Sequence, residues 1–81
     1  MKKQELIHLH GLLAEVSNDI AAYYEAELEL EEYESLGVRP TSIHQSKTDH
    51  KAAVSALARG ITSEMHELEE KEEEAVATTA D

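Results

Sequence analysis

The sequence contains no cysteine, tryptophan or phenylalanine, and only one proline and three glycines among its 81 residues. Without cysteine, a disulfide scaffold, a thiolate metal site and a cysteine nucleophile are all excluded. No segment approaches the ~20 consecutive apolar residues that a membrane-spanning helix needs, and the first residues do not lead into the apolar core of a signal peptide. We therefore expect one small, soluble domain located in the cytoplasm.

Acidic side chains outnumber basic ones by 18 to 7, which gives a formal net charge of −11. The charge is uneven, because residues 1–34 and 64–81 each carry −7 whereas residues 35–63 carry +3. The acidic arms would repel a phosphate backbone, so nucleic-acid binding is disfavoured. The acidity fits either a salt-rich cytoplasm, where salt screens self-repulsion, or ordinary acidic helix faces. The basic centre is the exception, and it is where we look for a functional site.

Apolar residues recur at steps of three and four through the first half of the chain, as on one face of a helix. The residues of this stripe are Leu6, Leu9, Leu13, Val16, Ile20, Tyr23 and Leu30, with Leu12, Tyr24 and Leu28 beside it. The stripe weakens at Glu27, where the helical spacing calls for an apolar residue. Gly37 suits a left-handed helix cap and Pro40 follows it, so the pattern predicts one helix over residues 4–36.

A second apolar stripe predicts a helix over about residues 46–73, after a loop at 37–45. Its residues are Val54, Leu57, Ile61, Met65 and Leu68. Two capping-box patterns compete for its start, one from Ser42 to Gln45 and one from Ser46 to Asp49. Gly60 falls inside the helix, where close approach of another helix is the usual reason for glycine. The glutamate-rich end is followed by a predicted disordered tail over 75–81.

These elements predict an all-α fold, a long antiparallel hairpin of two helices forming one domain over residues 1–74. Such a hairpin leaves the edges of both apolar stripes in water, and a short chain without disulfides usually compensates by oligomerisation. Two hairpins packed as a four-helix bundle would bury those edges. Because two-fold dimers are the commonest closed form, we expect a homodimer, with higher homo-oligomers also allowed.

Five histidines in a chain of this length invite a test for a metal site. The candidate ligands for a divalent metal such as zinc are His10, His44 and His50. In an antiparallel hairpin, His10 would lie about 35 Å from the other two along the helices, so a shared site would have to cross a subunit boundary. The competing interpretation is that the histidines lie exposed or half-buried at the borders of the apolar stripes.

A second candidate site, for an anion such as a phosphate or carboxylate, consists of Lys47, Lys51 and Arg39. These residues lie near the start of the predicted second helix, where free backbone N–H groups and the positive end of the helix dipole attract anions. The competing interpretation is that a lysine beside an apolar stripe extends into water or pairs with a carboxylate. The three tyrosines are expected to pack at the core of the bundle and its edge.

The sequence gives little support for catalysis. It has no nucleophile elbow, no Gly-rich phosphate loop and no HExxH motif. We therefore expect a non-enzymatic, homo-oligomeric binding module. The alternative is a structural or adaptor bundle in which the same residues form a polar network.

Two segments, Glu5-Leu6-Ile7-His8-Leu9-His10 and the run from Pro40 to Val54, resemble an archaeal family of small helical proteins, uncharacterised protein family fifty-eight. The resemblance covers roughly residues 1–65 and includes the family histidine at His10 and the block Ile43-His44, Ser46-Lys47 and His50-Lys51. The family has no established activity, so the resemblance implies no catalytic residues. It implies an archaeal, cytoplasmic origin, and the acidity favours a halophilic one. It also favours the histidines and lysines within these segments over His8 and His66.

Overall fold

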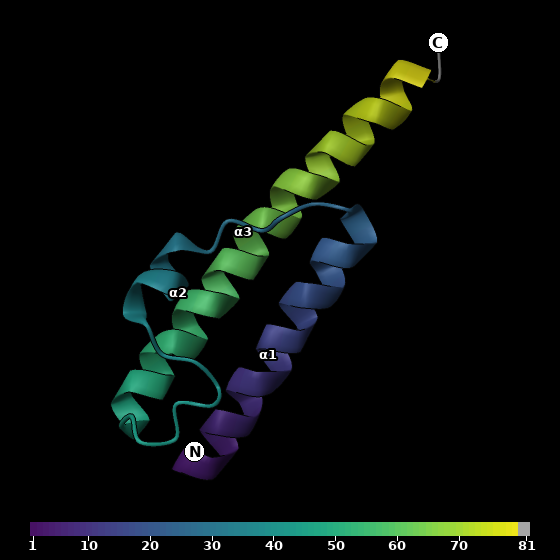
Figure 1. Cartoon of the computed structure of the whole chain (residues 1–81). Coiled ribbons are helices and arrows are strands. Elements are labelled where there is room, and N and C mark those ends of the chain that lie inside the picture. Colours follow the sequence, from purple (N-terminus) through teal and green to yellow (C-terminus); the bar gives the residue numbers. More distant parts are fainter. Residues whose placement is uncertain (80–81) are drawn as a thin grey trace.

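The computed structural model describes the backbone of residues 1–79, which forms three helices and no strand (Figure 1). Helix α1 spans Lys3–Tyr24, α2 spans Glu31–Leu36 and α3 spans Lys47–Thr79. The long helices α1 and α3 pack against each other, and α2 packs on α3. The predicted all-α class and the packing of two long helices are therefore confirmed. In this part of the chain, no helix combines the length and the apolar character needed to cross a membrane.

The two long helices run in the same direction, which corrects the antiparallel direction expected from the sequence. Near the start of α1, His10 contacts His50 in the first turn of α3. At the end of α1, burial raises the pKa of Tyr24, and the carboxylates of Glu72 and Glu69 in α3 raise it further. Residue numbers therefore increase together along both helices. Residues 25–46 connect the two helices in sequence and lead the chain back from the end of α1 to its start (Figure 1).

The predicted single helix over residues 4–36 is wrong, because α1 ends at Tyr24 and α2 begins at Glu31. Glu25 caps α1 in the left-handed conformation, with φ at 52°, and its N–H donates to the carbonyl oxygens of Ala21 and Ala22. The next residues alternate exposed glutamates with the half-buried Ala26, Leu28 and Leu30. A period of two belongs to extended chain. A continuous helix would also set several glutamates four residues apart, where like charges repel each other.

The start of α3 decides between the two capping patterns. Ser46 Oγ accepts a hydrogen bond of 3.0 Å from the backbone N–H of Asp49, and the Asp49 carboxylate accepts one of 3.3 Å from the N–H of Ser46. Ser42 instead lies in a loop turn, where its N–H donates to the Arg39 carbonyl oxygen. At the other end, α3 continues to Thr79. The predicted disordered tail is therefore helical over residues 75–79, and residues 80–81 lie outside the described part of the chain.

The core lies where α2 and the loop after it meet α3, and α1 covers it from the other side. Its buried members are Tyr33, Val38, Ala53, Ala56, Leu57 and Ile61, with Leu13, Ala14, Ile20, Leu30 and Met65 packed around them. A Cβ atom at Gly60 would lie 2.7 Å from Cδ2 of Leu30. The glycine thus admits the returning chain against α3. A close approach is present, but it comes from Leu30, just before α2, and not from another helix as expected.

Candidate functional site

Two of the three predicted metal ligands, His10 and His50, meet inside a single chain. Their Nδ1 atoms lie 3.1 Å apart, and both side chains are fully buried, with 0% of their surface exposed. The expectation that a site containing both would cross a subunit boundary is wrong, because it assumed antiparallel helices. In the parallel arrangement the two histidines lie near the same end of the molecule.

Two further groups extend this contact into a chain of hydrogen bonds. The Tyr33 hydroxyl of α2 lies 2.7 Å from Nε2 of His10, and the backbone carbonyl oxygen of Ser42 lies 2.8 Å from Nε2 of His50. We call the Tyr33, His10 and His50 side chains and the Ser42 carbonyl the histidine network. It joins all three helices and the loop before α3. Every buried side-chain nitrogen and oxygen in the described part of the chain has a hydrogen-bond partner.

The positions of the protons in the neutral network follow from the Ser42 carbonyl, which can only accept a hydrogen bond. His50 Nε2 must therefore donate, which leaves His50 Nδ1 as an acceptor. His10 Nδ1 must then donate to it, so His10 Nε2 accepts the hydrogen bond from the Tyr33 hydroxyl. All three hydrogen bonds thus point from Tyr33 towards Ser42, and each histidine has one defined tautomer.

This arrangement opposes protonation of His10. Burial lowers the pKa of His10 below its ordinary value of 6.5, and the neighbouring His50 and Arg39 lower it further. The Arg39 guanidinium lies 5.6 Å from the centre of the Tyr33 ring. If both histidines were protonated, their Nδ1–H groups would point at each other across 3.1 Å. The geometry therefore disfavours protonation of both rings at once.

The third predicted metal ligand, His44, does not join the pair. Its side chain is exposed in the loop before α3. Throughout the part of the chain that the structure describes, no three His, Cys, Asp or Glu side chains gather in a way that could hold a metal ion. His8 and His66 are also exposed, and His66 lies 3.1 Å from Glu70. A single chain thus supplies a pair of histidines and not a set of three.

At the helix start where the anion site is predicted, the Asp49 carboxylate lies among the basic residues. Lys47, Lys51 and Arg39 are all exposed. The Asp49 carboxylate already accepts a hydrogen bond from the Ser46 N–H at the start of α3, where it supplies the negative charge that this end of a helix favours. Anion binding here stays a prediction.

Sequence reasoning missed Tyr33 and the Ser42 carbonyl as members of the network. Tyr33 was expected to be a core or core-edge residue, and it is indeed 5% exposed, but its hydroxyl partner depends on how the chain returns. The available signal was a single aromatic residue within a run of glutamates. The Ser42 carbonyl has no side-chain signature at all, so no sequence pattern identifies it.

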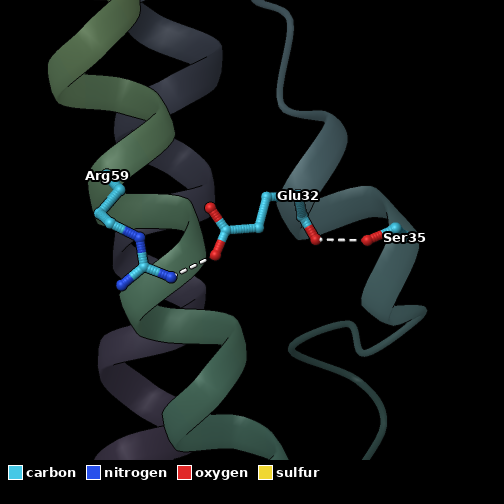
Figure 2. Close-up of polar contacts among 3 residues, drawn as sticks. All are labelled: Glu32, Ser35 and Arg59. Carbon is cyan, nitrogen blue, oxygen red and sulfur yellow. Dashed lines mark hydrogen bonds and ion pairs between the residues drawn. The ribbon is translucent and has the colours of Figure 1, made fainter.

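The position of α2, which carries Tyr33, is also supported on the surface. Arg59 of α3 donates to the carboxylate of Glu32 in α2, and the Ser35 hydroxyl donates to the Glu32 carbonyl oxygen at 2.8 Å (Figure 2). The hydrogen bond from Arg59 lowers the pKa of Glu32. Because both charged side chains are about 60% exposed, we expect this ion pair to contribute less to stability than the buried network.

Comparison with known proteins agrees with the family resemblance of the two segments Glu5–His10 and Pro40–Val54. The model of uncharacterised protein family UPF0058 matches residues 1–80. UPF0058 proteins of Archaeoglobus fulgidus and Methanothermobacter thermautotrophicus are 40% and 39% identical over 62 residues, which cover 76% of this chain and 67% and 61% of theirs. The crystal structure of Vng1086c from Halobacterium salinarium is similar over 100% of both chains, with a TM-score of 0.74 and 28% identity. The chain therefore belongs to uncharacterised protein family UPF0058.

Proposed function

We propose that this protein is a non-enzymatic, homo-oligomeric helical module that binds a second copy of itself through α1. The observation that carries the proposal is an apolar surface on α1 at helical spacing. Leu12, Val16 and Tyr23 are 46%, 43% and 76% exposed, and Leu9 is half-buried beside them. We call these four residues the outer face of α1. They lie on a different stripe from Leu6, His10 and Ser17, the buried residues of the helix.

The size of the molecule supports self-association. In the part of the chain whose burial the structure describes, seven apolar residues are buried. This number is small for a chain without disulfides, and pairing with another copy is a common remedy. An apolar surface on one face of a helix is also the kind of feature that marks protein–protein contact. The outer face of α1 would become buried in a four-helix arrangement of two α1 and two α3 helices.

The histidine network supports the non-enzymatic part of the proposal. Both rings are fully buried, so a substrate in solution has no access to their nitrogen atoms. Each ring also uses both nitrogens in hydrogen bonds. Groups satisfied in this way suit a structural role, here to hold α1, α2 and α3 in the arrangement that presents the outer face.

The setting of this module is the part of the proposal that rests on the sequence and the relatives. We place it in the cytoplasm of an archaeon, with a halophilic host as the favoured case. The net charge of −11 and the similarity to Vng1086c of Halobacterium salinarium support this placement.

The oligomeric state tests the proposal directly. At about 100 µM, light scattering after size-exclusion chromatography is expected to give at least twice the mass of one chain. The double variant Leu12→Glu, Val16→Glu should be monomeric, because it places two carboxylates in the contact. Ile43→Glu is the matched control, because Ile43 is also an exposed apolar residue, at 58%, but lies in the loop. A monomeric wild type at this concentration would refute the proposal.

A second candidate function, binding of a divalent metal such as zinc, is favoured by one specific observation. The two Nδ1 atoms converge, while both Nε2 atoms are held by partners of the kind that orient metal-ligating histidines. Their separation of 3.1 Å is close to the roughly 3.3 Å between two nitrogens on one tetrahedral zinc ion. Metal binding would require His10 to carry its proton on Nε2, donating to the Tyr33 oxygen. Because both rings are fully buried, the site would have to open to admit the ion and the water molecules that complete its coordination.

Zinc content tests this second function. After incubation with excess zinc and removal of free metal, the wild type should retain about one equivalent per chain at neutral pH and release it on acidification, because protonated histidine does not bind metal. His66→Ala removes an exposed histidine and should retain the same amount. A structural zinc site binds tightly enough to keep its ion when free metal is removed. Retention of less than about a tenth of an equivalent by the wild type would therefore exclude the site.

A further inference from the structure

The outer face of α1 continues into a shallow groove near the start of the helix. The groove is lined by Met1, Gln4, Glu5, His8, Leu9 and Leu12. Tyr23 lies on the same face near the other end of α1 and is the most exposed of the large apolar side chains in the described structure, at 76%. One helix thus carries an apolar groove at its beginning and a projecting aromatic ring at its end. The ring of each copy can enter the groove of the other only if the two α1 helices run in opposite directions.

Charge supports the same direction. Lys2 is exposed at the start of α1, and Lys3 beside it donates a hydrogen bond to the Ile43 carbonyl oxygen. The glutamates that follow the end of α1 are exposed, namely Glu25, Glu27 and Glu29. The helix dipole has the same polarity, positive at the start and negative at the end. Antiparallel helices would bring the lysines of one copy to the glutamates of the other. Parallel helices would place lysines against lysines and glutamates against glutamates, which costs energy.

One register satisfies the groove, the apolar face and the charges together. If Leu12 lies opposite Val16 of the partner subunit, the groove around Glu5 lies opposite Tyr23 of the partner subunit. The same register places the exposed Lys2 opposite Ala26 of the partner subunit, between two exposed glutamates. The three pairings are related by one two-fold axis near the middle of α1, as a closed symmetric dimer requires.

We infer that two copies of this chain pair through antiparallel α1 helices, with Tyr23 of each copy seated in the groove at the start of the other α1. This inference rests on the proposed self-association and specifies its surface, direction and register. The contact buries the outer face and leaves the histidine network inside each subunit. The two α3 helices then lie on the outside of the pair and point in opposite directions.

Distances between spin labels test the direction, and the absence of cysteine from the sequence makes each label unique. In the Lys2→Cys variant the two labels of a dimer should lie roughly 35 Å apart, given the rise of the helix. In Glu15→Cys, whose site is exposed near the middle of α1, they should lie within about 20 Å, the reach of neighbouring helices and two label arms. A parallel dimer would give similarly short distances at both sites and would overturn the inference.

The Tyr23→Ala variant tests the register separately. Because a buried aromatic anchor commonly dominates such a contact, its loss should weaken the dimer at least roughly tenfold. Leu36→Ala, which removes an exposed apolar side chain from α2, should leave the dissociation constant unchanged. A dimer that is as tight in Tyr23→Ala as in the wild type would overturn the register, whereas a monomeric wild type would overturn the proposed function itself.

Discussion

Replacing His50 by alanine is expected to lower the free energy of unfolding by about 3 kcal/mol, one of the two largest effects that we predict. The variant leaves the His10 Nδ1–H group without its acceptor and the Ser42 carbonyl without its donor. It also opens a cavity at a position that is fully buried, and buried polar groups without partners are costly. Urea denaturation followed by circular dichroism measures the change.

His44→Ala is the matched control, because it removes an exposed histidine from the neighbouring loop. We expect its effect to stay within about 0.5 kcal/mol. Tyr33→Phe should give an intermediate loss of about 1 kcal/mol, because only one hydrogen bond at the end of the network is removed. If His50→Ala were as mild as His44→Ala, the network would not be what holds the helices together.

Acidification is expected to destabilise the protein, by up to about 1.4 kcal/mol per pH unit below pH 6.5. The pKa of His10 in the folded protein lies below its ordinary value of 6.5. On a fall in pH the unfolded chain therefore takes up the proton first, which favours unfolding. The loss begins near the unfolded pKa and ends at the folded one. Above pH 6.5 neither state holds this proton, and its contribution to stability is fully present.

The measurement is a series of urea denaturation curves between about pH 7.5 and 5.5, a range in which carboxylates stay largely ionised. Salt at about 1 M screens the general repulsion among the acidic side chains. His8→Ala lacks an exposed histidine and should show the same slope as the wild type. An NMR titration of the His10 ring should place its midpoint below 6.5. A free energy of unfolding that stays constant or rises as the pH falls would contradict a lowered pKa of His10 in the folded protein.

The second half of the fold follows from the sequence more closely than the first. The stripe containing Leu57 and Ile61 predicts α3 well, because its period of 3.6 residues is unambiguous and a capping box marks its start. Between Glu25 and Leu30, leucines and glutamates fit a weakened helical stripe and an extended alternation alike. The choice depends on whether Leu30 has a place to pack. That place, at Gly60, lies 30 positions further along the sequence.

The wrong direction predicted for the two long helices follows from the wrong end predicted for α1. A continuous helix to residue 36 leaves only a short loop, which forces an antiparallel hairpin. With α1 ending at Tyr24, the connection over residues 25–46 is long enough to return along the whole helix. For the same reason, His10 and His50 were identified as candidate residues but placed far apart. The residue types could be predicted from the sequence, whereas their meeting required the path of the chain.

That path has a consequence for how the protein folds. In a simple helical hairpin, contacts near the loop form first, and contacts further from the loop form after them in order. Here His10 and His50 are 40 positions apart. The segment that packs against the first turns of α1 is therefore distant from them in sequence. The chain must close this long loop before α1 can dock. We infer a contact order above that of ordinary helical bundles and correspondingly slower folding, with α1 docking only after α3 has left the ribosome.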